Sequence, residues 1–173
     1  EERDLKLILR LIADYGLIGL PSAGKSSLLN ELTAANVKTA AYPFTTLEPN
    51  LGVFNARVLA DIPGLIEDAA EGKGLGHKFL KHIERTHALV HLVDISWCLE
   101  PFEAYECYIT IRQELEKYSP ELMNKKEIVC LTKIDTMQEE DIQKYMQFFE
   151  DQLDKKVLPL SAVSGRGVFD LKE

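Results

Sequence analysis

The chain has 173 residues, of which 46% are hydrophobic and 28% charged, and these values are ordinary for one soluble globular domain. The formal net charge of −8 argues against a domain that clamps nucleic acid by itself, because phosphate contacts need clustered lysine and arginine. No apolar run is as long as a membrane span, and three cysteines without metal-ligand spacing indicate reduced, mostly buried thiols of a cytoplasmic protein.

Short apolar runs alternate with longer amphipathic segments along the chain. In chain order we expect a strand over 15–20, a helix over 26–35, a hairpin of strands over 51–54 and 57–60, a helix over 77–85, a strand over 88–95, a helix over 102–118, a strand over 127–132, a helix over 139–153 and a strand over 157–160. This alternation predicts an α/β fold with a mostly parallel six-stranded sheet flanked by helices on both faces. Residues 168–173 predict one turn of a closing helix that the chain truncates. Ligands of such folds bind beyond the carboxyl ends of the strands.

The segment between the first strand and the first helix fits the pattern G-x-x-x-x-G-K-[ST]. Its glycines let consecutive backbone N–H groups point at phosphate oxygens, and the helix adds the positive end of its dipole. Lys25 is expected to reach the β- and γ-phosphates, and the Ser26 hydroxyl to ligate Mg²⁺. The motif alone does not distinguish ATP from GTP. The predicted phosphate-binding loop consists of Gly19, Leu20, Pro21, Ser22, Ala23, Gly24, Lys25 and Ser26.

A second loop, Asp61-Ile62-Pro63-Gly64, follows the third predicted strand, over 57–60. Asp61 is placed to hold Mg²⁺ through a water, and the Gly64 N–H to bond the γ-phosphate, a contact that exists only while that phosphate is present. A switch also needs a hydroxyl that completes the Mg²⁺ shell. Two threonines, Thr45 and Thr46, are available for this role.

Two late loops carry signs of base recognition. Thr132-Lys133-Ile134-Asp135 fits [NT]-K-x-D, in which the carboxylate accepts from guanine N1–H and the 2-amino group. Adenine offers no such pair of donors, so it would leave a buried carboxylate unpaired. Ser161, Ala162 and Val163 follow the last strand, where the Ala162 N–H can bond guanine O6.

These loops occur in the order found in translation-factor-class GTPases, and two segments are more specific. YPFTTLEPNLG at 42–52 and DIPGLIEDAAEGKGLGHKFLKHIERT at 61–86 resemble the Obg (also called CgtA) family of bacterial ribosome-associated GTPases. The resemblance implies a P-loop NTPase fold of the Ras-like G-domain type over residues 13–173. Residues 1–12 look like the junction from an N-terminal domain.

The resemblance also implies roles for individual residues. Magnesium would be held by Ser26, Thr46 and, through water, Asp61; catalysis would involve Lys25, Thr46 and Gly64. Further nucleotide-binding residues would be Phe44, Thr45, Thr46, Leu47, Glu48, Asp61, Ile62, Pro63 and Gly64.

The implied ligands are GTP and GDP with Mg²⁺, and also guanosine tetraphosphate. The implied role is in assembly of the large ribosomal subunit and in growth and stress control. We expect a cytoplasmic monomer that does not bind membranes and that contacts the ribosome mainly through domains outside this chain.

Three positions depart from the family pattern. Thr132 replaces the usual asparagine, which predicts a weaker contact with guanine N7 and with the phosphate loop. Ser22 replaces an asparagine associated with potassium activation, so a role for potassium stays open. Asn55-Ala56 is a very short connection, which means either a clipped hairpin or a missing tip.

Leu65 follows Gly64, at the position where Ras has the glutamine that orients the attacking water. A leucine cannot do this, so we expect slow intrinsic hydrolysis. The alternative is a nucleotide-sensing interaction module in which hydrolysis is incidental. A small-molecule kinase is disfavoured, because T-K-x-D with S-A has no purpose in one.

Overall fold

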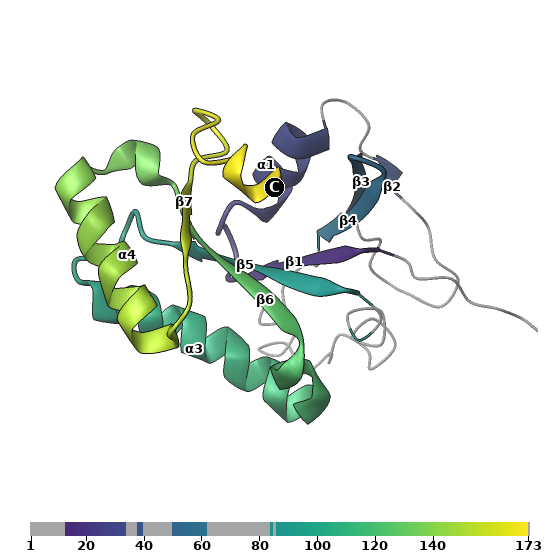
Figure 1. The fold of residues 1–173 in the computed structure, drawn as a ribbon, viewed down its shortest axis with the longest axis horizontal. Helices are drawn as coiled ribbons and strands as arrows, with labels where there is room; N and C mark the ends of the chain where they lie inside the picture. Colours follow the sequence, from purple (N-terminus) through teal and green to yellow (C-terminus); the bar gives the residue numbers. More distant parts are fainter. Residues whose placement is uncertain (1–12, 34–37, 40–49, 62–83, 85, 173) are drawn as a thin grey trace, which may run out of the picture.

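A computed structural model describes residues 13–33, 38–39, 50–61, 84 and 86–172. Figure 1 shows a twisted sheet of strand order β2-β3-β4-β1-β5-β6-β7 with helices on both sides. The strands are β1 Tyr15–Gly19, β2 Lys38–Thr39, β3 Asn50–Phe54, β4 Arg57–Asp61, β5 Ala88–Asp94, β6 Lys126–Thr132 and β7 Leu158–Leu160. The helices are α1 Lys25–Thr33, α3 Pro101–Tyr118 and α4 Glu139–Leu153, with 3₁₀ turns η1 Pro120–Asn124, η2 Ile134–Thr136 and η3 Asp170–Lys172.

All six predicted strands are present, and the two-residue strand β2 is added at the edge. β4, β1, β5, β6 and β7 run parallel, while β2 and β3 pair antiparallel with their neighbours. Of the predicted helix over 77–85, only Glu84 is among the described residues, and the predicted turn at 168–173 forms as η3 over Asp170–Lys172. No helix within the described ranges is long and apolar enough to cross a membrane.

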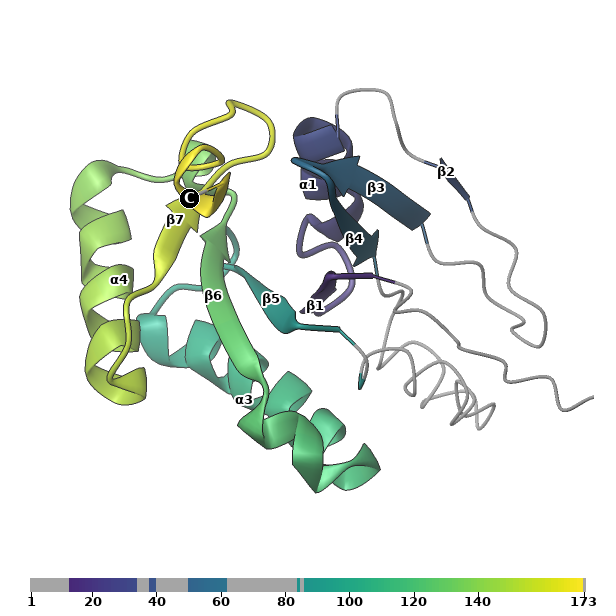
Figure 2. The same ribbon diagram turned by 45° about the vertical axis from the view of Figure 1, so that its right-hand side comes forward.

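Alternate residues of the central strands pack on opposite faces, as the period of two in a strand requires. Val90 and Leu92 pack with α1 in one core cluster, and Val93 with α3 and α4 in another. Figure 2 shows α1 on one side of the sheet and α3 and α4 on the other. Burial also agrees with the prediction for the cysteines, since Cys98 and Cys130 are buried and Cys107 is half-buried, all as free thiols.

The short connection between β3 and β4 is a complete two-residue turn. Phe54 pairs with Arg57 at the end of the ladder, and both intervening residues have positive φ, 47° at Asn55 and 60° at Ala56. Two such residues make the type I′ turn, whose twist matches that of the flanking strands. Of the two alternatives for Asn55-Ala56, a clipped hairpin or a missing tip, the clipped hairpin is therefore correct.

A buried charge cluster joins β5, β6 and α3. The Glu127 side chain is 3% exposed and accepts hydrogen bonds from Tyr108 (3.0 Å) and Lys155 (2.7 Å), with Arg112 Nη1 3.5 Å away. His91 Nδ1 lies 2.9 Å from Glu127 Oε1, and burial lowers the His91 pKa below its ordinary value, so the ring is neutral and donates to the carboxylate. Burial alone would raise the Glu127 pKa, but these hydrogen bonds and cations outweigh it and hold the pKa at about 2.

This cluster predicts that acid destabilises the fold. Below pH 6.5 the unfolded chain binds a proton at His91 that the folded chain does not, and between about 4.5 and 2 the same holds for Glu127. Both contributions therefore lower the free energy of unfolding as pH falls, by on the order of 3 kcal/mol from Glu127 alone. Denaturant unfolding across this pH range measures the effect.

The variant that tests the contribution of the Glu127 carboxylate is Glu127→Gln. It leaves Lys155 and Arg112 without their carboxylate, so the free energy of unfolding at pH 7 should fall by about 3 kcal/mol. The slope between pH 4.5 and 2 should flatten. Glu114→Gln, which removes an ion pair to the exposed Lys117, should change stability by less than about 0.5 kcal/mol. Equal stability of E127Q and the unmodified chain at pH 7 would contradict this account.

Candidate nucleotide-binding site

The predicted site residues follow the carboxyl ends of neighbouring parallel strands, so the topology brings them to one edge of the sheet. The loop 20–24 joins β1 to α1, Asp61 ends β4, Thr132 ends β6, and Ser161 follows β7. Phe44, Thr45, Thr46, Leu47 and Glu48, and likewise Ile62, Pro63 and Gly64, lie outside the described residues. Their assignments stay predictions.

The phosphate loop depends on glycine at its first position. Gly19 has a φ of 150°, and a Cβ there would lie 2.4 Å from the Leu92 carbonyl oxygen of β5, so no larger residue fits. Gly24 has a φ of 95°, and Ser22 a φ of 63°. Asparagine tolerates that left-handed region better than serine, so Ser22 is the less favourable residue for this backbone.

The lysine of the motif lies inside the loop. Lys25 is 8% exposed, and its Nζ donates to the carbonyl oxygens of Gly19 (3.0 Å) and Leu20 (2.9 Å). The loop thus encloses a buried positive charge at the amino end of α1. An anion is the natural ligand for this position.

Ser26 and Asp61, 35 residues apart in sequence, are brought together beneath the loop. Ser26 Oγ donates to Asp61 Oδ2 at 2.5 Å, and Asp61 is 4% exposed. Its other oxygen, Oδ1, is buried and has no hydrogen-bond partner within the part of the chain that the structure describes. A hydroxyl beside a carboxylate with an unused oxygen fits a hard cation and its waters, which is the donor set that Mg²⁺ prefers.

The T-K-x-D loop is attached directly to the phosphate loop. Thr132 is 3% exposed, and its hydroxyl donates to the Ala23 carbonyl oxygen at 2.9 Å. The contact with the phosphate loop that the loss of asparagine was expected to weaken is therefore made by the threonine. Ile134 anchors the loop in the core, and the Asp135 carboxylate is exposed.

The last loop is held by Ser161, which is fully buried. Its N–H donates to the Arg166 carbonyl oxygen (2.9 Å), and its hydroxyl accepts from the Ser164 N–H (3.1 Å). Ser161 thus shapes the loop, while Ala162 is half-buried and Val163 is 85% exposed.

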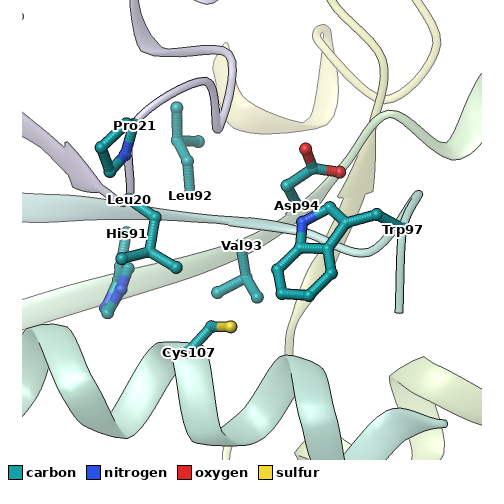
Figure 3. Close-up of a pocket in the computed structure, with 8 residues that line it drawn as sticks. All are labelled: Leu20, Pro21, His91, Leu92, Val93, Asp94, Trp97 and Cys107. Carbon is teal, nitrogen blue, oxygen red and sulfur yellow. The ribbon is translucent and has the colours of Figure 1, made fainter. Parts of the chain in front are cut away.

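One residue beside the T-K-x-D loop belongs to none of the sequence motifs. Asp94, at the end of β5, forms an ion pair with Lys133, with 2.6 Å between Oδ2 and Nζ. It also lines a cavity of about 220 Å³ between the phosphate loop, β5 and α3 (Figure 3). The signal that could have indicated it is its position, because the carboxyl end of a parallel strand is where ligand-binding residues gather.

Comparison with known proteins matches residues 14–133 to the family model described as 50S ribosome-binding GTPase. The chain is similar to GTPase Obg of Aquifex aeolicus strain VF5, at 48% identity over 100% of this chain and 52% of that protein. It is similar to GTPase Obg of Rickettsia felis at 49% identity over 97% of this chain and 51% of that protein. The chain thus spans about half the length of these curated relatives, and they confirm the resemblance drawn from the sequence.

Two solved structures share the fold. The G domain of the T. maritima FeoB iron transporter superposes with a TM-score of 0.63 at 26% identity, covering 91% of this chain and 92% of that one. A variant of Aquifex aeolicus Era bound to GDP and AlF4⁻ gives a TM-score of 0.67 at 22% identity, covering 91% of this chain and 54% of that one. The predicted P-loop G-domain fold is confirmed.

The bond between Thr132 and Ala23 predicts the effect of Thr132→Val. Valine keeps the shape but leaves the Ala23 carbonyl, in a residue only 1% exposed, without this donor. The free energy of unfolding should fall by about 1–2 kcal/mol, as measured by denaturant unfolding. Thr132→Ser keeps the hydroxyl and should retain most of the stability. A valine variant as stable as the unmodified chain would show that the bond contributes nothing.

Proposed function

The chain is a GTPase domain that belongs to the family of 50S ribosome-binding GTPases, and we propose that it is a GTP-hydrolysing switch of the Obg type. The observation that carries the proposal is the hydrogen bond from Thr132 to Ala23, which joins the base-reading loop to the phosphate loop. One nucleotide can therefore contact both loops, with its phosphates at 19–26 and its base at 132–135.

In this proposal the amides of the phosphate loop and the Lys25 ammonium bind the phosphates. Asp135 accepts from guanine N1–H and the 2-amino group, the Lys133 stem lies along the base, and the Ala162 N–H donates to O6. The exposed Asp135 carboxylate is accessible to such a ligand, and the rigid Ser161 turn next to Ala162 supports the last contact.

Ser26, Thr46 and Asp61, the last through water, would hold Mg²⁺. When bound, the cation neutralises charge on the β- and γ-phosphates. The unused Asp61 Oδ1 supports this assignment, since it offers an acceptor for a metal-bound water. A role for potassium would depend on Ser22, which replaces the asparagine associated with potassium activation.

We further propose slow intrinsic hydrolysis, with Thr46 and Gly64 sensing the γ-phosphate. Leu65 motivates it, because its side chain cannot orient a water.

The family description and the Obg names support a role in large ribosomal subunit assembly and in growth and stress control. The ribosome would be bound mainly by parts of the protein outside this chain, with residues 1–12 as the junction. The chain would act as a cytoplasmic monomer and also accept guanosine tetraphosphate.

Asp135→Asn tests the base site. An asparagine amide can no longer accept both guanine donors but suits xanthine, so preference should move from GDP to XDP. Competition against a fluorescent GDP analogue measures both affinities, with Asp154→Asn, an exposed acid at the end of α4, as the control. Unchanged GDP affinity in the Asp135 variant would remove the base-site assignment.

Single-turnover hydrolysis with and without large ribosomal subunits separates the switch from the alternative, a nucleotide-sensing module. We expect a slow rate alone and a faster one when the subunit is added to the full-length protein. A rate that no ribosomal partner raises would favour the sensing module.

A further inference from the structure

Asp94 lies where β5 ends, beside the end of β6, and both its oxygens are engaged. Oδ2 pairs with Lys133 Nζ at 2.6 Å. Oδ1 accepts from the Ser96 N–H (2.9 Å) and the Ser96 hydroxyl (2.7 Å). The Asp94 side chain is 9% exposed, so its carboxylate is shielded from water and the ion pair is stronger than one on the surface.

Lys133 needs this support, because its backbone is in the left-handed region, with φ 62° and ψ 33°. Side chains with a Cβ rarely adopt that conformation unless surrounding contacts impose it. The Lys133 carbonyl oxygen accepts from the Thr136 N–H (3.2 Å) and hydroxyl (2.9 Å). The ion pair to Asp94 fixes the other end of the residue, its ammonium.

We propose that Asp94 is a positioning residue for guanine recognition, which holds the Lys133 ammonium aside so that the lysine stem can lie along the base. Asp135 is two residues further on the same turn, so a displaced Lys133 also misplaces the carboxylate that reads guanine. The proposal rests on the assignment of Lys133 and Asp135 to the base site made above.

A fluorescent reporter lies in the same region, namely Trp97, the one tryptophan of the chain. Asp94 and Trp97 line one cavity of about 220 Å³, and Figure 3 shows the indole beside the Asp94 carboxylate. A nucleotide that settles along Lys133 alters the field of this ion pair, so Trp97 emission should report GDP binding.

The test is Asp94→Asn, which keeps a side-chain oxygen for Ser96 but removes the charge that holds Lys133. Dissociation of a fluorescent GDP analogue should speed up about three- to tenfold, the effect of losing one partly exposed charged hydrogen bond. The change in Trp97 emission on adding GDP should be lost. The control is Glu100→Gln, which removes a 2.8 Å ion pair to Lys144 in the same region without contacting the T-K-x-D loop. Its dissociation rate should not change.

A second variant, Lys133→Met, keeps the stem and removes the ammonium. It should also abolish the Trp97 response, and adding D94N to it should accelerate dissociation no further. An unchanged dissociation rate in D94N, or additive effects in the double variant, would overturn the proposal. Should D94N fail to fold, a full Trp97 response in K133M would overturn it equally. Asp135→Asn distinguishes failure of this inference from failure of the proposed base site. If Asp135→Asn shifts preference to XDP while D94N has no effect, the base site is supported and only the role of Asp94 is wrong.

Discussion

The site depends on one close approach, that of the Gly19 backbone to the Leu92 carbonyl of β5. A Cβ at 2.4 Å from that oxygen is impossible, so only glycine lets the chain turn from β1 into the phosphate loop without separating β1 from β5. Because β1 also pairs with β4 on its other side, the point along the strands at which the loop begins is fixed. Lys25 and Ser26 are thereby fixed relative to the ends of three strands.

The strands β4, β5 and β6 each contribute a polar residue at the carboxyl end. Asp61 of β4 accepts from Ser26, Thr132 of β6 donates to Ala23, and Asp94 of β5 pairs with Lys133. A shift of any one strand would move its residue away from the ligand as well as away from the core. In the proposed site, the residues that would recognise phosphate and base therefore lie on loops, while the rigid parallel ladder sets their geometry.

Much of this was predictable from the sequence, because strand and helix periods and the ordered motifs depend on local pattern. The phosphate loop, the acidic strand end and the T-K-x-D loop were found in this way. Asp94 and Glu127 were not, since the roles of these two acids depend on side chains 15 to 39 residues away in the sequence. The sequence also could not show that Thr132 makes the contact with the phosphate loop in place of asparagine, because this depends on the position of the Ala23 carbonyl.

The distribution of charge resolves how a domain of net charge −8 can bind a polyanion. The first turn of α4 carries three acidic residues and that of α3 carries Glu103, so these helices offset their own dipoles. The first turn of α1 has no acidic residue and begins with Lys25. Of the described carboxylates nearby, Asp94 is paired with Lys133 and Ser96, and Asp61 accepts from Ser26 while its second oxygen is left for the cation proposed above. The amino end of α1 therefore keeps its positive potential, and a phosphate can supply the anion that the other two helices provide for themselves.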